Sequence, residues 1–278
     1  MAVDLHTHSN ASDGTDSPAQ VVAAAAEAGL ATVALTDHDS TAGLQAARAE
    51  GARRRIELIP GVELSLQWAH GTMHILVYFV EPGDDGVEDA LARLRAGRHD
   101  RNRRIVADLI AGGVDITYDE VLQVAGEATV GRPHIARLLI EKGVAADMQQ
   151  TFDEILGTRG WAYRPRVRIT VDQLRGLIRN GNRVAVLAHP HTVGFGDDWD
   201  LVMDALASLP VAGVEVYYPG YEPARRRRLL DAVRAAGLIW TGGSDYHGDN
   251  KPQISIGTGL GDLEVPDRCA EMLHETRA

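Results

Sequence analysis

Histidines and carboxylates stand at the ends of many short apolar runs in this 278-residue chain, and both residue types bind metal ions. His6 and His8 form a His-x-His pair at the end of the first run, and Asp245 and His247 repeat this spacing near the end of a late one. Residues two apart on a strand point to the same face, so each pair can reach one point. The remaining candidates are Asp13, His38, Glu63, His74 and His189.

These nine residues supply six imidazoles and three carboxylates, which is more than a single ion uses. They suit a cluster of about two or three divalent ions that share a carboxylate or a hydroxide. Parallel strands closed into a barrel bring their carboxyl ends to one rim. Ligands far apart in the sequence would therefore meet there.

The elements that must position these residues alternate along the chain. Short apolar runs occur at Val3–His8, Ala31–His38, Ile56–Leu64, Thr72–Val80, Val184–His189, Val211–Tyr217, Leu238–Asp245 and Ile254–Gly257. Segments of helical period lie between them, such as Pro18–Ala28 before Gly29 and Ala42–Glu50 before Gly51. This alternation predicts an α/β fold with βαβ units in a mostly parallel sheet or barrel.

The alternation stops once, between the fourth and fifth runs, where helical stretches occur at Arg98–Ile110 and Pro133–Glu141. We expect residues 93–168 to form a helical insertion that caps the barrel, and residues 1–92 and 169–278 to form the barrel itself. The insertion carries 13 basic residues against 10 acidic ones, in a chain whose formal net charge is −11. An arginine-rich lobe on an acidic body indicates that the lobe meets an anion.

The composition excludes several classes of function. The net charge argues against nonspecific binding of duplex DNA, because that affinity comes from Lys and Arg at the phosphates. No apolar run is long enough to span a membrane and no signal peptide is visible, so we expect a cytoplasmic protein without membrane contact. Cys269 is the only cysteine, so any metal site must use nitrogen and oxygen ligands.

Other polar residues allow two interpretations. His191 lies two residues after His189 and either faces the same site or belongs to a loop. Asp37 is better suited to orient an imidazole than to bind a metal, and Glu215 either does the same or is satisfied within the core. We expect His70, His99 and His274 to be ordinary surface residues.

The order of these residues resembles the PHP (polymerase and histidinol phosphatase) family of metal-dependent phosphoesterases. The segments that carry the resemblance are Asp4-Leu-His-Thr-His8, Ser12-Asp-Gly14, Leu35-Thr-Asp-His-Asp39, Pro60-Gly-Val-Glu63, His74, Ala188-His-Pro190 and Gly243-Ser-Asp-Tyr-His-Gly248. In the insertion, Thr129-Val-Gly-Arg-Pro-His-Ile-Ala136 resembles the subgroup that acts on nucleoside 3′,5′-bisphosphates and on the 5′ ends of short RNA.

The resemblance implies a distorted (β/α)7 barrel with a trinuclear metal site. One ion would be held by His6, His8, Glu63 and Asp245, a second by Glu63, His74 and His189, and the third by Asp13, His38 and His247. Many relatives have a histidine in place of Asp13, although a carboxylate also binds metals. We expect three divalent ions, with manganese favoured over iron or zinc; the ligand types alone do not choose among them.

The function implied is hydrolysis of the 3′-phosphate of a nucleoside 3′,5′-bisphosphate, such as adenosine 3′,5′-bisphosphate to AMP and phosphate, by a hydroxide that bridges two ions. The substrate would be a small phosphorylated nucleotide or a short RNA. Candidates for gripping its second phosphate are Asn102, Arg103, Arg104, Arg132 and His134, since an arginine fork matches phosphate oxygens. Water or a nearby acid would protonate the leaving oxygen, and His191 and His247 are the two candidate acids.

Four alternatives stay open. The first is a 5′-3′ exonuclease on short 5′-phosphorylated RNA, and the second is another phosphatase of the same family, such as one acting on histidinol phosphate. The third is an amidohydrolase-type deaminase or amidase, which often bridges its metals with a modified lysine. Lys142 and Lys251, the only lysines, stand in poor positions for that role. The fourth is a catalytically silent scaffold, which we would expect to have lost ligands. The sequence does not indicate the oligomeric state.

Overall fold

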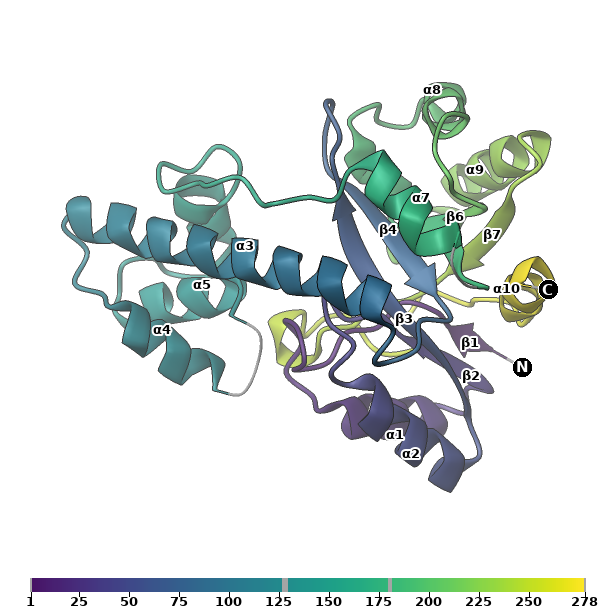
Figure 1. Ribbon diagram of the computed structural model, residues 1–278, viewed down its shortest axis with the longest axis horizontal. Coiled ribbons are helices and arrows are strands. Elements are labelled where there is room, and N and C mark those ends of the chain that lie inside the picture. The colour runs from purple at the N-terminus through teal and green to yellow at the C-terminus, as the bar shows by residue number, and fades with distance from the viewer. Residues whose placement is uncertain (1, 127–129, 180–181, 278) are drawn as a thin grey trace. The chain divides into compact units, whose positions relative to one another are not determined.

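The computed structural model describes residues 2–126, 130–179 and 182–277 (Figure 1). The chain divides into two compact units, which we call unit 1 (Met1–Ala90 and Arg168–Ala278) and unit 2 (Leu91–Val167). The first boundary falls within one long helix, α3 (Asp85–Ala111). Unit 1 contains the strands, and the part of unit 2 that the structure describes is helical.

Unit 1 is built on a seven-stranded sheet in the order β1-β2-β3-β4-β5-β6-β7. The strands are β1 (Val3–Asp4), β2 (Thr32–Leu35), β3 (Glu57–Leu66), β4 (Met73–Tyr78), β5 (Val184–Leu187), β6 (Gly213–Tyr217) and β7 (Ile239–Gly242). Neighbours pair in parallel except around β4, which is antiparallel to both β3 and β5. The prediction of a mostly parallel sheet is therefore confirmed, with β4 as the exception.

The sheet closes because the chain after β7 bonds to the chain after β1. Leu5 N donates to Gly242 O, Asp245 N donates to His6 O, and His8 N donates to Tyr246 O, at 3.1, 2.9 and 2.9 Å. The first and last strands thereby become neighbours, and the sheet forms a distorted barrel. Its interior is apolar and includes Leu76, Tyr78 and Val186.

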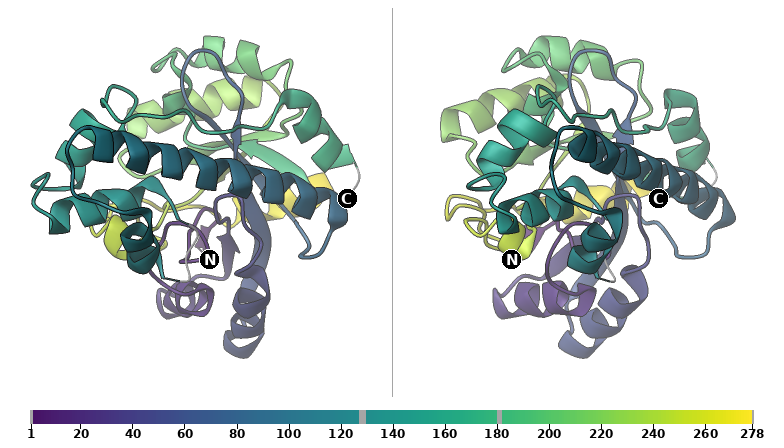
Figure 2. Two further views of the ribbon diagram at one scale, coloured as in Figure 1. Left: turned by 60° about the vertical axis from the view of Figure 1, so that its left-hand side comes forward. Right: turned by 90° about the vertical axis from the view of Figure 1, so that its left-hand side faces the viewer.

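Helices of unit 1 cover the outside of the barrel. They are α1 (Pro18–Glu27), α2 (Leu44–Arg54), α7 (Val171–Arg179), α8 (Trp199–Leu206), α9 (Pro223–Ala235) and α10 (Arg268–Arg277), with the short helices η2 (Pro190–Val193) and η3 (Gly248–Asn250) in loops. Figure 2 shows α1 and α2, in purple and dark blue, side by side. Ser17 caps α1 in a capping box with Gln20, and Gly29 follows its end with φ of 77°.

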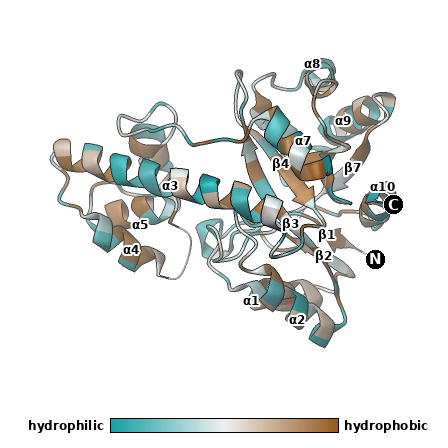
Figure 3. Cartoon of the chain, viewed as in Figure 1, coloured by the Kyte–Doolittle hydropathy of each residue, from teal (hydrophilic) through white to brown (hydrophobic). Residues whose placement is uncertain are grey.

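Unit 2 contains most of α3, together with α4 (Tyr118–Ala125), α5 (Arg132–Glu141), α6 (Met148–Gln150) and the π-helix η1 (Thr151–Leu156). Its own core includes Ile105, Leu109, Val121, Ile135 and Leu139. The strands of unit 1 consist mostly of hydrophobic residues, whereas many residues of α3 are hydrophilic (Figure 3). Unit 2 thus has an apolar centre of its own.

Two predictions of element boundaries are wrong. Helix α2 does not stop at Gly51 but continues to Arg54, and the left-handed residue Arg55 ends it. A side chain at Gly51 would lie only 3.1 Å from Ile56 O. The glycine therefore serves close packing against the chain before β3. Ile254–Gly257 is not a strand, since its backbone is used elsewhere: Gly257 N donates to the Asp4 carboxylate at 2.8 Å.

No helix among the described residues is both long enough and apolar enough to cross a membrane.

Candidate metal centre

All nine predicted ligands lie in unit 1, at the end of the barrel where most strands finish. His6 and His8 follow β1, Asp13 lies in the turn beyond them, His38 follows β2, Glu63 lies in β3, His74 in β4, His189 follows β5, and Asp245 and His247 follow β7. Eight of them are buried and His74 is partly exposed. A buried cluster of this kind needs charge compensation, because unpaired ionised groups are strongly disfavoured away from water.

His74 reaches the cluster for a different reason from the other ligands. Strand β4 runs antiparallel to β3, so His74 stands near its beginning and pairs with Ser65, two residues beyond Glu63. Its Nδ1 atom lies 2.7 Å from Glu63 Oε1. A reversed strand therefore contributes its first residues to the rim at which the parallel strands end.

Seven of the nine candidates, all except His189 and Asp245, form three overlapping groups whose ligand atoms lie within 4.8 Å of one another. The groups are His8 with Asp13, His38 and His247; His6 with His8 and Glu63; and His38 with Glu63 and His74. Glu63 belongs to two of them. A carboxylate shared in this way is the usual bridge between neighbouring divalent ions.

Hydrogen-bond acceptors face one another across this cluster. His6 Nδ1 lies 2.9 Å from Glu215 Oε1, which places a ring proton on Nδ1, so that Nε2 carries the lone pair when the ring is neutral. That Nε2 atom lies 3.1 Å from His8 Nε2 and 3.4 Å from Glu63 Oε2. His8 Nδ1 is buried as well, without a hydrogen-bond partner among the described residues.

His189 is oriented in the same way as His6, with Nδ1 bonded to an acceptor and Nε2 facing the cluster. The Thr192 hydroxyl donates to Thr72 O at 2.8 Å, so it accepts from His189 Nδ1 at 3.2 Å. The lone pair of His189 Nε2 then points at Glu63 Oε1, 3.0 Å away. Lone pairs that converge in this manner fit divalent cations, so the donor set matches a metal centre built from nitrogen and oxygen ligands.

Electrostatics keep the carboxylates of the cluster ionised. Burial alone would raise the pKa of Glu63, but His38, His74 and His6 outweigh it and hold that pKa well below its usual value. The same balance of burial against His38 and His247 depresses the pKa of Asp13. Burial lowers the pKa of His8, yet Asp245 and Glu63 raise it to about 9. Acidic and imidazole groups therefore stabilise each other's charged forms before a metal binds, and a bound metal would replace the imidazole protons.

A second layer of buried groups orients the ligands. Glu215 binds His6 through one oxygen and accepts from His189 N through the other, at 2.9 and 2.7 Å. Of its two interpretations, the structure supports the orienting one. Asp37 accepts from Ser9 and Ser12 in the turn that leads to Asp13, so it shapes that turn. Asp4 accepts from Ser244 N and Gly257 N and ties two loops to the first strand.

Two residues that sequence reasoning did not assign contact Asp245. The Tyr218 hydroxyl donates to Asp245 Oδ2 at 2.8 Å, and Lys251 Nζ lies 2.6 Å from the same oxygen. Lys251 was considered in the sequence only as a modified lysine bridging two metals. It instead reaches Asp245 as an ammonium group, because η3 turns the chain back after His247. The signal available in the sequence was small: one of only two lysines follows the last ligand by four residues.

The two candidate acids lie in different settings. His247 belongs to a ligand group, with Nδ1 bonded to Asp245 O at 2.8 Å and Nε2 3.4 Å from Asp13. His191 lies beside Tyr221, whose hydroxyl is 2.7 Å from its Nδ1. Burial, together with His189 and Arg225, lowers the pKa of His191 to about 4, so its ring is neutral near pH 7.

The candidate phosphate-binding residues all lie in unit 2. Asn102 is buried and donates to Val130 O at 2.8 Å, while His134 accepts from Gly131 N at 2.9 Å and caps α5. Arg103 stacks on Tyr118, and Arg132 donates to Leu156 O at 2.9 Å. Thr129, the first residue of the motif, lies outside the described residues.

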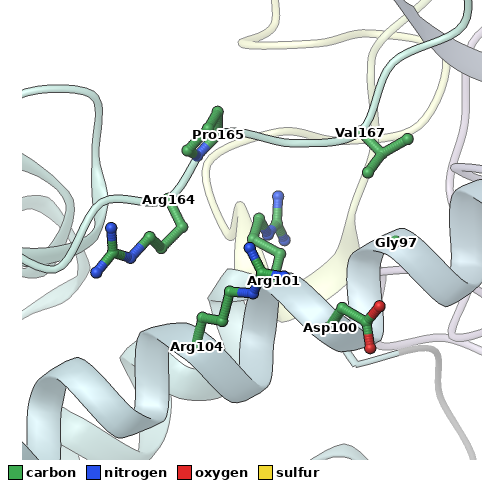
Figure 4. A pocket seen from close by; sticks show the side chains of 7 residues that line it. All are labelled: Gly97, Asp100, Arg101, Arg104, Arg164, Pro165 and Val167. Carbon is green, nitrogen blue, oxygen red and sulfur yellow. The ribbon is translucent and has the colours of Figure 1, made fainter.

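A pocket of about 170 Å³ occurs within unit 2 (Figure 4). It is lined by Gly97, Asp100, Arg101, Arg104, Arg164, Pro165 and Val167. Arg101 and Arg104 extend from α3 with their guanidinium groups near each other, whereas Arg164 turns aside and pairs with Asp108 at 2.6 Å. Like charges that converge on a pocket favour an anionic ligand.

Comparison with known proteins agrees with this geometry. A model of the PHP domain matches residues 4–157. A 3′,5′-nucleoside bisphosphate phosphatase from Chromobacterium violaceum is 32% identical over 99% of this chain and 96% of its own length. The 5′-3′ exoribonuclease Rnm from Salmonella typhimurium is 33% identical over 92% of this chain and 88% of its own.

A solved structure from Bifidobacterium adolescentis, described as a metal-dependent phosphoesterase, superimposes with a TM-score of 0.86 at 30% identity. The alignment covers 99% of this chain and 96% of the other. Sequence and fold thus match the same group of proteins over nearly their whole lengths.

Proposed function

Since the chain belongs to the PHP domain family of phosphoesterases, we propose that it removes the 3′-phosphate from nucleoside 3′,5′-bisphosphates, as in adenosine 3′,5′-bisphosphate to AMP and phosphate. The observation that carries the proposal is the convergence of imidazole nitrogens on the two oxygens of Glu63. The bisphosphate phosphatase of C. violaceum, similar over nearly the whole chain, supports this choice of substrate.

We assign the metal ligands in three sets. His6, His8, Glu63 and Asp245 form the first, Glu63, His74 and His189 the second, and Asp13, His38 and His247 the third. The three overlapping groups of ligand atoms support the places of seven residues, with His8 and His38 each close to two sets. Asp245 is placed by its distances of 3.6 and 3.4 Å from His6 and His8, and His189 by its distance of 3.0 Å from Glu63. We propose manganese as the preferred ion. When bound, divalent ions lower the pKa of water towards about 7 and withdraw charge from the phosphoryl group.

The residues around the cluster then have separate tasks. Glu215 fixes the proton of His6 on Nδ1 and holds His189 through its backbone, so that their Nε2 lone pairs face inwards. In the reaction a water oxygen bonds to phosphorus and the bond from phosphorus to the 3′-oxygen breaks. Because the ring of His191 is neutral near pH 7, we favour water as the donor of the proton that the leaving 3′-oxygen takes up.

We propose that the second phosphate binds to arginines of unit 2, with Arg104 and Arg132 as the main contacts and Arg103 beside them. Arg104 supports this proposal because it lines the pocket and forms no ion pair within the described part of the chain. Asn102 and His134 bond to the backbone of Val130 and Gly131, immediately before Arg132. Both therefore hold the segment that carries this arginine.

The exonuclease alternative has support of its own, since the similar S. typhimurium protein is a 5′-3′ exoribonuclease. The same bond would break in a 5′-phosphorylated dinucleotide, and the transferred phosphate would remain on the 5′-oxygen of the second nucleoside. Both substrates are small and phosphorylated. We propose that the enzyme meets them in the cytoplasm, without duplex DNA or membranes as partners.

Arg132→Ala tests the proposed substrate. We expect the kcat/KM for adenosine 3′,5′-bisphosphate to fall about 10- to 100-fold, the usual loss for a charge-assisted hydrogen bond, with a much smaller effect on p-nitrophenyl phosphate. Arg159→Ala, an exposed arginine in the same unit, is the matched control and should change neither rate. Equal losses of Arg132→Ala on both substrates would contradict the assignment.

A further inference from the structure

Lys251 places an ammonium group against the ligand cluster. It follows η3, and its Nζ atom lies 2.6 Å from Asp245 Oδ2 and 3.5 Å from Asp245 O. The side chain is 35% exposed, whereas that of Asp245 is 9% exposed. The ammonium therefore lies at the boundary between the buried ligands and the solvent.

The two oxygens of Asp245 have different surroundings. Oδ1 faces the other ligands, at 3.6 Å from His6 Nε2, 3.4 Å from His8 Nε2 and 3.5 Å from His247 Nδ1. Oδ2 faces away from them and receives Lys251 together with the Tyr218 hydroxyl. Lys251 thus does not occupy the oxygen that points at the metal centre.

No other lysine or arginine forms an ion pair with Asp13, Glu63 or Asp245 in the described ranges. An ammonium has three hydrogens, and Asp245 takes one at short range and a second at 3.5 Å. Nζ has no third acceptor among the described residues, and the side chain is partly exposed, so we assign the third hydrogen to a ligand. A phosphoryl oxygen bound at the same cluster is the chemical group that this donor and this charge would suit.

We propose that Lys251 contacts the phosphoryl group of the substrate and favours dianionic phosphomonoesters over monoanionic phosphodiesters. A monoester has one more negative charge and one more non-bridging oxygen than a diester with the same leaving group. A fixed ammonium gains more from the dianion, particularly in a site partly shielded from water. Lys251 would then set the balance between removing a terminal phosphate and cleaving an internucleotide bond.

The test compares two substrates that differ at one oxygen, p-nitrophenyl phosphate and methyl p-nitrophenyl phosphate. In Lys251→Met we expect kcat/KM for the monoester to fall about 10-fold or more relative to that for the diester. Bound metal, measured by elemental analysis, should equal that of the wild-type protein. Lys142→Met is the matched control, because Lys142 pairs with Glu120 in unit 2, and its monoester-to-diester ratio should match the wild type.

A charge-rescue experiment distinguishes a contact between the ammonium and the phosphoryl group from a purely structural role of Lys251. Lys251→Cys treated with 2-bromoethylamine regains an ammonium of nearly the same reach, while Cys269 is buried. We expect the wild-type ratio to return. If Lys251→Met does not fold, Lys251→Gln takes its place in the comparison.

Equal losses on both esters, or a loss that follows the loss of metal, would overturn the proposal. The test needs only phosphoesterase activity and so does not depend on the proposed substrate. Hydrolysis of both p-nitrophenyl esters without hydrolysis of the bisphosphate would contradict the proposed function. The monoester-to-diester ratio of kcat/KM would still decide the role of Lys251. If the wild-type protein hydrolyses only the monoester, inhibition by inorganic phosphate replaces the ratio as the measurement. Weaker inhibition in Lys251→Met than in the wild type would support the proposal, and equal inhibition would overturn it.

Discussion

Glu215 determines which nitrogen of His6 faces the ligand cluster, although it is not itself a predicted ligand. It is fully buried and bonds to His6 Nδ1 and to the backbone of His189. Such carboxylates behind a histidine fix its tautomer and increase its basicity. The sequence placed Glu215 on the sixth strand without deciding its role, because a strand pattern does not reveal what a buried acid contacts.

Glu215→Gln should weaken metal binding about 10- to 100-fold, since an amide supports the required tautomer less strongly than a carboxylate. Isothermal titration of the metal-free protein with manganese measures this change. Glu264→Gln, at an exposed glutamate, is the control and should bind as the wild type does. An unchanged affinity in Glu215→Gln would show that His6 is oriented in another way.

Metal binding should also depend on pH in a defined direction. A histidine must be neutral to bind a metal. Burial lowers the pKa of His8, but Asp245 and Glu63 outweigh it and raise that pKa to about 9. At pH 7 the metal must therefore displace a proton, and its affinity should rise with pH until about pH 9, by up to about 10-fold per unit for each proton released. Titrations in buffers of different ionisation enthalpy count these protons. An affinity independent of pH between about 6.5 and 8.5 would contradict this coupling.

At the scale of elements, the site depends on how the barrel closes. The chain after β7 bonds to the chain after β1, which brings Asp245 and His247 beside His6 and His8. A glycine makes this approach possible, because a side chain at Gly243 would lie 2.4 Å from the backbone N and from Cβ of His6. The sequence predicted the strands that meet but not this contact, which depends on the register between the first and last strands.

Gly243→Ala should destabilise the protein by about 1–3 kcal/mol and reduce bound metal, because the added methyl group displaces His6. Gly176→Ala is a matched control in the exposed helix α7, where nothing lies within 4 Å of the added atom. It should stabilise the protein by about 0.5–1 kcal/mol. Urea unfolding measures the stability of both variants, and elemental analysis measures their bound metal. A Gly243→Ala protein with normal stability and metal content would contradict this account of how the barrel closes.

At the scale of the whole molecule, charge divides between the two units. Unit 2 has a formal net charge of +2 and unit 1 of −13. Hydrophobic periodicity predicted the fold class and the helical segment between β4 and β5, whereas the distorted barrel was implied by the resemblance of the motifs to a known family. The sequence did not predict the reversed direction of β4 or the contact of Lys251 with Asp245, since both depend on turns whose geometry has no strong sequence signal.

The residues proposed to bind the second phosphate lie in unit 2. The sequence analysis predicted five residues for phosphate binding. In the structure, Asn102 and His134 bond to backbone atoms, and Arg104 lines a pocket. Periodicity locates such residues on helices but does not say which side chains their neighbours occupy. Arg101, which also lines the pocket, was not predicted to bind phosphate, because the sequence does not distinguish it from the many other arginines of unit 2.

Product analysis with adenosine 3′,5′-bisphosphate tests the central claim most directly. The manganese-loaded protein should convert it to adenosine 5′-monophosphate and an equal amount of inorganic phosphate, separable by chromatography. Formation of adenosine 3′-monophosphate, or no turnover of the bisphosphate by a protein that carries its full complement of metal, would contradict the account.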